Sequence, residues 1–195
     1  MTNDEVIEEF RQAGALLEGH FLLSSGLHSA AYLQCARVMM DARRGMRLCR
    51  ALAERITGSL GADAIDMVVS PAMGGVIVGY EMGRQLGVPA MFAERVDDAL
   101  LLRRGFALNA GDRVLMAEDI VTTGKSSREC IDCITDHGGR VVAASCLIDR
   151  SDGAVDLGVP LFALAGFKLP SYAADDMPPE LAALPAVKPG SRAKI

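Results

Sequence analysis

The sequence of 195 residues has no tryptophan, only 5% aromatic residues and no long uncharged apolar run. Its longest stretch without Asp, Glu, Lys or Arg is 19–36, and the histidines, serines and glutamine within it exclude a membrane span. The acidic amino terminus, MTNDEVIEEF, lacks the basic and then apolar layout of a signal peptide. We therefore expect a cytoplasmic protein that makes no contact with a membrane.

Basic residues are also scarce. The chain has 20 Lys and Arg against 25 Asp and Glu, which gives a formal net charge of −5. A dedicated nucleic-acid-binding domain is expected to carry a basic stripe, so this balance argues against a nucleic-acid partner. It still allows small anions to bind in a locally positive cleft.

The five cysteines are an odd number without regular spacing, which fits a reducing compartment and no disulfide framework. Cys130 and Cys133 have CxxC spacing, but they have no partner pair and no flanking histidine. We interpret them as buried thiols of a helix and not as a redox or zinc site.

The length and the 50% hydrophobic content fit one compact domain over 1–195. We expect 1–40 to contribute a helix and a small hood, and 170–195 to form a proline-rich strap without chemistry. Apolar periodicity predicts helices over 3–17, 42–58, 75–86 and 124–137. Thr2 or Asn3 is expected to cap the first helix, and Asp41 the second.

Short apolar runs alternate with these helices. They predict strands over 65–70, 88–94, 112–118, 140–148 and 159–165. Fully apolar strands alternating with helices are typical of an α/β fold whose parallel sheet is flanked by helices on both faces. In such folds ligands bind beyond the carboxyl ends of the strands.

The most informative segment is VLMAEDIVTTGKSS at 114–127. An apolar strand leads to two adjacent acids, Glu118 and Asp119, and then to a turn of hydroxyls and glycine that opens a helix. Main-chain N–H groups at a helix amino terminus bind phosphate, and the acids suit sugar hydroxyls, as in a ribose phosphate. A Walker A loop is excluded because it needs glycine where Asp119 stands. A simple strand end and helix cap would not need two acids and four hydroxyls.

This segment resembles the 5-phosphoribosyl pyrophosphate (PRPP) signature of the type I phosphoribosyltransferases. The resemblance implies that the acids hold the ribose 2- and 3-hydroxyls and that the following loop holds the 5-phosphate. Asp119 is also a candidate catalytic residue. The candidate PRPP-binding residues of this segment are Glu118, Asp119, Ile120, Val121, Thr122, Thr123, Gly124, Lys125 and Ser126.

Two further segments extend this resemblance. SPAMGG at 70–75 is similar to the pyrophosphate loop of the family, which implies that Ala72, Met73 and Gly74 bind PRPP, although a plain strand-to-helix turn would look alike. FAERVDDALLLRRGF at 92–106 is interpreted as a mobile lid that brings positive charge to the departing pyrophosphate, the alternative being a solvated loop. Arg95 and Arg103 are its candidate PRPP-binding residues, and Arg95 is also a candidate catalytic residue.

The segment GHFLLSSGLHSAAYLQ at 19–34 is expected to be a loop-rich hood, and it resembles the F-x-L-x-S-G-x-x-S-x-x-Y element of the orotate branch of the family. Many members have lysine where Ser24 stands, and many have a different lid. The two histidines of the segment are interpreted as ordinary hydrogen-bonded residues. The resemblance implies that orotate is bound by Ser25, Gly26, Tyr32, Thr122 and Arg150.

Arg150 follows the strand predicted over 140–148. Its guanidinium would offer a bidentate fork to the orotate carboxylate, whereas a surface salt bridge is the simpler alternative. The resemblance implies transfer of phosphoribose from PRPP to N1 of orotate, with orotidine 5′-phosphate and pyrophosphate as products, in pyrimidine biosynthesis. It also implies Mg²⁺ carried by PRPP without a dedicated protein metal site, and a homodimer.

Three alternatives stay open: a purine phosphoribosyltransferase, a PRPP-sensing regulator that binds nucleic acid, and a sugar-phosphate binding module.

Overall fold

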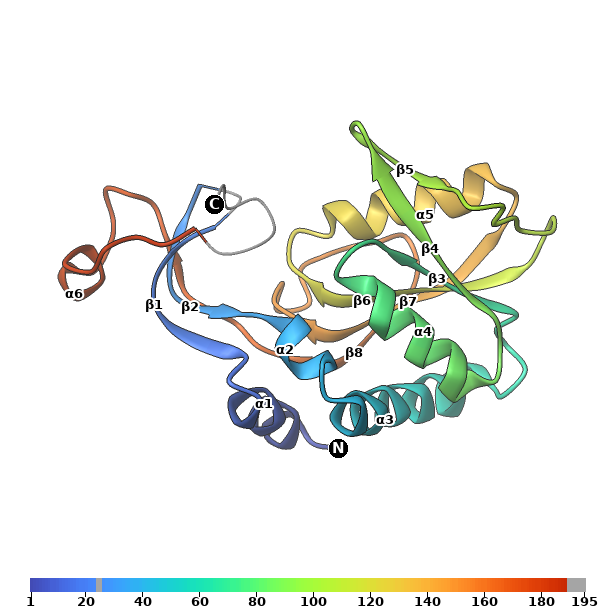
Figure 1. Cartoon of the computed structure of the whole chain (residues 1–195), viewed down its shortest axis with the longest axis horizontal. Coiled ribbons are helices and arrows are strands. Elements are labelled where there is room, and N and C mark those ends of the chain that lie inside the picture. The colour runs from blue at the N-terminus through green and yellow to red at the C-terminus, as the bar shows by residue number, and fades with distance from the viewer. Residues whose placement is uncertain (24–25, 189–195) are drawn as a thin grey trace.

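A computed structural model describes residues 1–23 and 26–188, which form a six-stranded and a three-stranded sheet with helices (Figure 1). The helices are α1 (Asn3–Gln12), α2 (Cys35–Met39), α3 (Ala42–Leu60), α4 (Gly75–Leu86), α5 (Lys125–Asp136) and α6 (Pro179–Ala182). The strands are β1 (Leu16–Leu22), β2 (His28–Leu33), β3 (Met67–Pro71), β4 (Ala90–Val96), β5 (Ala99–Leu102), β6 (Arg113–Val121), β7 (Arg140–Asp149), β8 (Leu161–Gly166) and β9 (Ser171–Tyr172).

The larger sheet has the strand order β5-β4-β3-β6-β7-β8. All its neighbouring pairs are parallel except β4 and β5, which form an antiparallel hairpin at the edge. Helices α1, α3 and α4 pack on one face and α5 packs on the other, so successive residues of β6 enter two separate cores. Leu115 is buried on the first face, and Val114 and Met116 on the second. The predicted α/β fold with a parallel sheet between helices is confirmed.

The expected helix over 3–17 is too long. Helix α1 ends at Gln12, Gly14 follows with φ +60°, and Leu16 already pairs with Leu33 of β2. The apolar residues near position 16 fit both the helical period and a strand, and pairing with β2 decides for the strand. The hood is therefore an antiparallel hairpin of β1 and β2, not the loop-rich segment that the sequence suggested.

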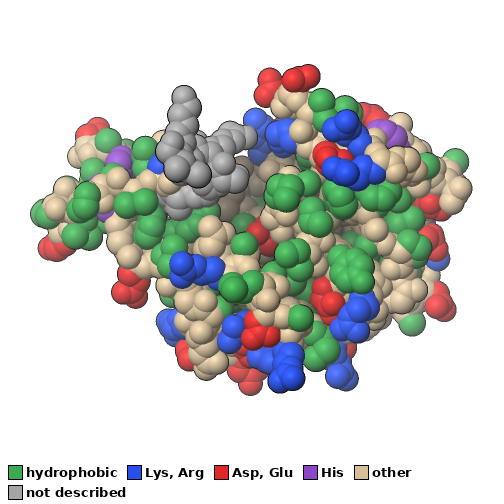
Figure 2. Space-filling model, viewed as in Figure 1, with side chains coloured by type: hydrophobic (Ala, Val, Ile, Leu, Met, Phe, Trp, Pro, Cys, Tyr) green, Lys and Arg blue, Asp and Glu red, His purple; other side chains and the backbone are tan. Residues whose placement is uncertain are grey.

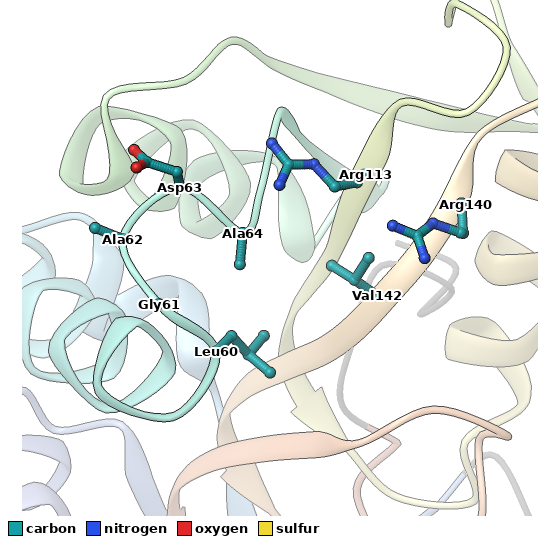
Figure 3. Close-up of a pocket in the computed structure, with 8 residues that line it drawn as sticks. All are labelled: Leu60, Gly61, Ala62, Asp63, Ala64, Arg113, Arg140 and Val142. Carbon is teal, nitrogen blue, oxygen red and sulfur yellow. The ribbon is translucent and has the colours of Figure 1, made fainter.

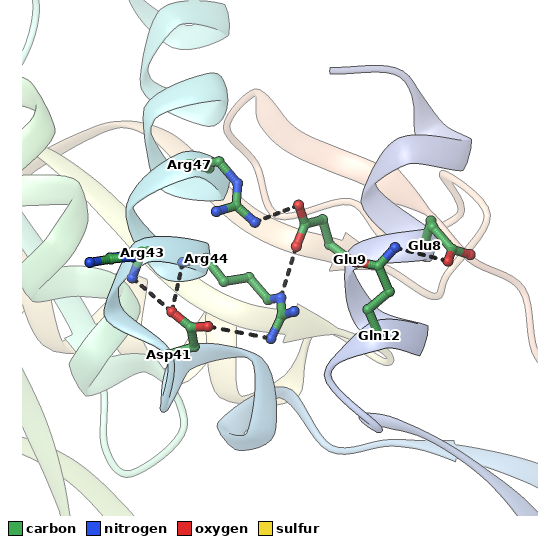
Figure 4. A network of polar contacts seen from close by, with 7 residues as sticks. All are labelled: Glu8, Glu9, Gln12, Asp41, Arg43, Arg44 and Arg47. Atoms are coloured by element: carbon green, nitrogen blue, oxygen red, sulfur yellow. Dashed lines mark hydrogen bonds and ion pairs between the residues drawn. The ribbon is translucent and has the colours of Figure 1, made fainter.

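Two predicted helix caps are confirmed. Thr2 Oγ1 accepts a hydrogen bond from the Glu5 main-chain N–H at 3.3 Å, and Asp41 Oδ1 accepts one from that of Arg43 at 2.9 Å. Helices α1 and α3 are joined through Glu9, whose carboxylate accepts hydrogen bonds from Arg44 Nε at 2.8 Å and Arg47 Nη2 at 2.6 Å (Figure 4). The hood hairpin therefore follows directly after α1, a helix that these contacts fix to α3.

The carboxyl-terminal segment returns to the hood. Strand β9 pairs with β2, and Val187 accepts a hydrogen bond from the main-chain N–H of Leu22 at 2.9 Å and donates one to His20 O at 2.8 Å. Part of the expected strap, 189–195, lies outside the described residues. No helix of the described chain is both long and apolar enough to cross a bilayer.

All five cysteines are buried and free. Cys130 and Cys133 lie on α5 and pack into the core between that helix and the sheet. This confirms their interpretation as buried helical thiols.

Gly79 of α4 allows the helix to approach β3 closely, because an added Cβ would lie 2.4 Å from Ser70 Oγ. We expect Gly79→Ala to lower the free energy of unfolding by about 1–3 kcal/mol through overpacking. Gly58→Ala on α3 is the matched control: its Cβ would meet no atom within 4 Å, so it should stabilise the protein by about 0.5–1 kcal/mol. Urea unfolding of both variants measures this, and equal effects would contradict the close packing.

Candidate functional site

The predicted motifs meet at the carboxyl ends of the central strands. The turn 72–74 follows β3, the turn 122–124 follows β6, and Arg150 follows β7. The turn after β3 lies close to the end of β6, since a Cβ added to Gly74 would lie 2.8 Å from Asp119 Oδ2. Arg150 is joined to the end of β6, because its main-chain N–H donates to Val121 O at 2.8 Å.

The turn after β6 opens directly into α5. Gly124 has φ +72°, and a Cβ there would lie only 2.5 Å from Val155 Cγ1, so no other residue fits this position. Four side chains are exposed around the turn: Thr122, Thr123, Lys125 and Ser126. Ile120 and Val121 belong to β6, and their contribution would come from the main chain. The turn thus presents hydroxyls, a lysine and a helix amino terminus to one side, as a phosphate site requires.

The two adjacent acids point in different directions, as successive strand residues do. Asp119 is partly buried beside Gly74, and its Oδ1 accepts a hydrogen bond from the Ile120 main-chain N–H at 2.8 Å. Burial raises the pKa of the Asp119 carboxyl. Asp119 is therefore the acid that faces the turn after β3.

Glu118 faces α5 instead and is 8% exposed. Its carboxylate accepts a hydrogen bond from the hydroxyl of Ser127, which is itself buried. Burial raises the pKa of Glu118 to about 7, the charge of Asp119 adds to the increase, and the Ser127 hydrogen bond opposes it. The sequence motif placed both acids on the sugar and ended at Ser126, so it missed this pairing.

Arg150 is partly buried, and its buried Nε has no hydrogen-bond partner among the described residues. Burial lowers the pKa of its guanidinium, while Tyr32 and Cys35 act in the opposite direction. Burial likewise raises the pKa of the Tyr32 phenol, to which Cys35 and Asp119 contribute. These four side chains therefore share one environment. No ion pair to Arg150 is present in the described chain, so the surface salt bridge that the sequence left open is not formed there.

The hood contributes Tyr32 from β2, whereas Gly26 lies in the connection between β1 and β2 with φ +85°. Ser25, an expected orotate contact, lies outside the described residues, as does Ser24. His20 is buried, with Nδ1 2.8 Å from Leu184 O and Nε2 2.6 Å from His28 Nδ1. This agrees with the interpretation of these histidines as hydrogen-bonded structural residues.

The expected lid is the β4–β5 hairpin, whose turn contains Asp97 with φ +53°. Arg95 forms an ion pair with Glu129 of α5 and donates to Asp98 O at 3.0 Å. Arg103 is exposed at the end of β5. The structure thus places Arg95 against α5, a contact that nothing in the sequence of the lid indicated.

Arg104, the other arginine of the lid, is bound within the hairpin. It donates two hydrogen bonds to Glu94, at 2.8 and 3.0 Å, and its guanidinium carbon lies 5.8 Å from the centre of the Phe92 ring. Its charge stabilises the hairpin and is therefore not free for a ligand.

A hollow of about 460 Å³ lies at the opposite edge of the sheet, where β6 and β7 begin (Figure 3). Arg113 points toward it but is paired with Asp66 through contacts of 2.6 and 2.8 Å. This hollow contains none of the predicted site residues. The candidate site is therefore the edge formed by the carboxyl ends of the strands.

Comparison with known proteins agrees with this geometry. Residues 39–158 match the family model described as a phosphoribosyl transferase domain, and the chain belongs to this family of transferases. It is 63% identical over 194 residues to the orotate phosphoribosyltransferase of Novosphingobium aromaticivorans, with 100% of each chain covered. It is 57% identical over 192 residues to that of Maricaulis maris, with 98% of each covered. Within the family the chain belongs to the orotate phosphoribosyltransferases, which are enzymes of pyrimidine biosynthesis.

Solved structures share the fold. The orotate phosphoribosyltransferase of Aeropyrum pernix has a TM-score of 0.68 at 26% identity, with 83% of this chain and 93% of that chain covered. The enzyme of Mycobacterium tuberculosis in complex with PRPP has a TM-score of 0.65 at 23% identity, over 84% of this chain and 95% of that one. The resemblance that the sequence motifs indicated is therefore confirmed at the level of the family.

The burial of Glu118 makes stability depend on pH. Its pKa of about 7 lies above the ordinary 4.5, so the folded state binds the proton more tightly. The stabilisation from protonated Glu118 is complete below about pH 4.5 and is lost as the pH rises through about 7. We expect Glu118→Gln to gain stability relative to the wild type over this range, on the order of 3 kcal/mol in total. Urea unfolding at several pH values, without ligand, measures the difference.

Glu94→Gln is the control for this measurement. The Arg104 guanidinium lowers the pKa of Glu94 below its ordinary 4.5. The stability of this variant relative to the wild type should therefore fall as the pH rises toward about 4.5 and stay constant from there through about 7. A constant difference between Glu118→Gln and the wild type at all pH values would contradict the assignment.

Proposed function

We propose that this chain binds PRPP and orotate at the carboxyl edge of the sheet and transfers the phosphoribosyl group to N1 of orotate, releasing pyrophosphate and orotidine 5′-phosphate. The observation that carries the proposal is the buried Nε of Arg150, which has no hydrogen-bond partner among the described residues. Leaving a desolvated donor unpaired is costly, and a planar carboxylate would satisfy it with two parallel hydrogen bonds. Orotate is a planar base that carries such a carboxylate.

The phosphate end of PRPP is assigned to residues 122–126, which are the turn after β6 and the first two residues of α5. Their exposed hydroxyls, Lys125 and the amino terminus of α5 together offer hydrogen bonds and positive charge to a phosphate dianion. Thr122 is the residue of this turn that we assign to orotate as well. Gly26 and Tyr32 of the hood, and Ser25, complete the proposed orotate contacts.

The sugar is assigned to Asp119, with Glu118 as the second acid of the motif. The transferred ribosyl group develops positive charge as pyrophosphate leaves, and a carboxylate at the sugar hydroxyls stabilises that charge. Asp119 is the better placed, because Glu118 is engaged by Ser127 on the other side of the strand. The protein forms no covalent intermediate, and its contribution is positioning and charge.

The pyrophosphate is assigned to Ala72, Met73 and Gly74, together with the arginines of the lid. Gly74 has no side chain and is exposed, so its main chain is accessible to a ligand beside Asp119. Arg95 is the candidate that acts on the departing group, and Arg103 is the second cation of the hairpin. For Arg95 to reach pyrophosphate it must leave Glu129, so lid movement accompanies catalysis.

Magnesium is proposed to enter with PRPP. Over the described part of the chain no group of three His, Cys, Asp or Glu side chains could hold a metal ion. The donor set fits an ion held by phosphate oxygens, sugar hydroxyls and water, which is the mode that Mg²⁺ prefers with phosphorylated substrates. When bound, the ion neutralises charge on the leaving pyrophosphate.

A homodimer in the cytoplasm completes the proposal. Three large apolar side chains are exposed along α4 and the turn before it: Met73 at 82%, Ile77 at 51% and Tyr80 at 68%. Figure 2 shows apolar side chains gathered on this face. A second copy covering this surface would remove it from water and would lie next to the proposed pyrophosphate turn. Five buried thiols without a disulfide suit the reducing cytoplasm.

Absorbance of orotate, followed after addition of PRPP, tests the proposed reaction. The wild type should consume orotate only when PRPP and Mg²⁺ are both present, and should leave adenine, guanine and uracil unchanged. Asp119→Asn should lower kcat about a hundredfold, because it removes the charge beside the ribosyl group. Its thermal stability should not fall, since the buried carboxylate is itself unfavourable. Activity with a purine, or an unchanged kcat in the variant, would refute the respective assignment.

Arg150→Gln tests the orotate subsite. It should raise the KM for orotate about tenfold to a hundredfold while changing the KM for PRPP much less, because only the bidentate pairing with the carboxylate is lost. Arg140→Gln is the matched control, since Arg140 begins the same strand at the opposite edge. Equal effects of the two substitutions on the KM for orotate would show that Arg150 does not bind it.

A further inference from the structure

Arg128 lies in the first turn of α5, two residues beyond Ser126, the last of the proposed PRPP-binding residues. Its guanidinium donates two hydrogen bonds to main-chain oxygens: Nη2 to Thr123 O at 2.5 Å and Nη1 to Asp156 O at 2.9 Å. It also covers Gly124, because a Cβ added there would lie 3.1 Å from Nη1. The side chain is thus a bridge between two segments far apart in sequence.

The two segments are the ones to which we assign the two substrates. Thr123 belongs to the proposed 5-phosphate turn, and Asp156 belongs to the segment 150–158, which begins with the proposed orotate residue, Arg150. The start of that segment is fixed by Asp149, whose carboxylate accepts hydrogen bonds from Ser151 N at 2.7 Å and Gly153 N at 3.1 Å. Its far end is held against the turn by the Arg128 bridge and by Val155 and Leu157, which pack on Gly124 and into the core beneath α5.

The charge of Arg128 is not neutralised by a bonded carboxylate. Both of its partners are carbonyl oxygens, and it makes no ion pair with any described residue, in contrast to Arg95 and Arg104. A cation in the first turn of a helix opposes the helix dipole, so this placement does not serve the stability of α5. It does add positive potential beside the turn that is assigned to a phosphate dianion.

We propose that Arg128 is a positioning residue that fixes the 5-phosphate turn and the Arg150 segment relative to each other. The sugar phosphate and the base then bind in the relative position that the transfer needs. The inference rests on the proposed function. Removal of the bridge frees the Thr123 carbonyl and leaves the far end of the Arg150 segment held by apolar packing alone. The pyrophosphate turn after β3 has no contact with Arg128 among the described hydrogen bonds.

Steady-state kinetics and calorimetric titration of the whole protein test the proposal. Arg128→Ala should raise the KM for PRPP and for orotate about tenfold each, and Arg128→Lys about threefold, because an ammonium can replace one of the two bonds. Binding of ribose 5-phosphate should weaken about tenfold in Arg128→Ala, whereas binding of pyrophosphate should change less than about twofold. A general loosening of the fold would weaken both ligands alike.

Arg55→Ala is the matched control, since Arg55 of α3 also donates to a main-chain carbonyl, that of Ala163 on β8. It should leave both KM values unchanged. The proposal is overturned if Arg128→Ala keeps both KM values within about twofold of the wild type, or if it weakens pyrophosphate as much as ribose 5-phosphate. If Arg128→Ala fails to fold, the same comparisons on Arg128→Lys decide. An inactive wild type would refute the proposed reaction instead, and the ribose 5-phosphate titration would still test the bridge.

Discussion

The site depends on the close approach of Asp119 at the end of β6 to Gly74 after β3. A Cβ at position 74 would lie 2.8 Å from Asp119 Oδ2, so a side chain there would displace the carboxylate from its place beside the turn. This contact sets a partly buried negative charge beside open main-chain groups. The proposed phosphate turn continues the strand that carries Asp119, and Arg150 follows the neighbouring strand β7.

The arginines near this edge differ in what their guanidinium groups are bonded to. Arg104 stabilises the lid hairpin through Glu94, and Arg95 is paired with Glu129 on α5. Arg128 is bonded only to carbonyl oxygens, and Arg150 keeps an unpartnered Nε within the described chain. Positive charge that is desolvated or held by neutral groups is available to an anionic ligand, whereas charge bound to a carboxylate must first be released. Arg128 and Arg150 therefore suit the binding of an anionic ligand, whereas the carboxylate-paired arginines of the lid suit a step in which the lid moves.

The local sequence pattern was sufficient to predict the helices and strands of the main sheet, but it was insufficient to predict the structure of the hood and the lid. Helix α4 was predicted over its observed range, and each predicted strand of the main sheet exists, because apolar runs bounded by glycine and proline leave little choice of structure. The segment at Leu16 was predicted as helix and is strand β1, since its apolar residues satisfy both periods. The β4–β5 hairpin has mixed charges and no clear alternation, so its antiparallel pairing had no local signal.

The amino-acid sequence by itself determined the family, the order of the motifs and the edge of the sheet at which they meet, because these depend on residues adjacent along the chain. Only the tertiary structure decided that Glu118 turns to Ser127, that Arg95 pairs with Glu129 and that Arg128 spans two loops. Each of these contacts depends on the direction of a side chain, which in turn depends on how α5 and the lid pack against the sheet. Such directions are set by the packing of whole elements, which no local pattern of residues encodes.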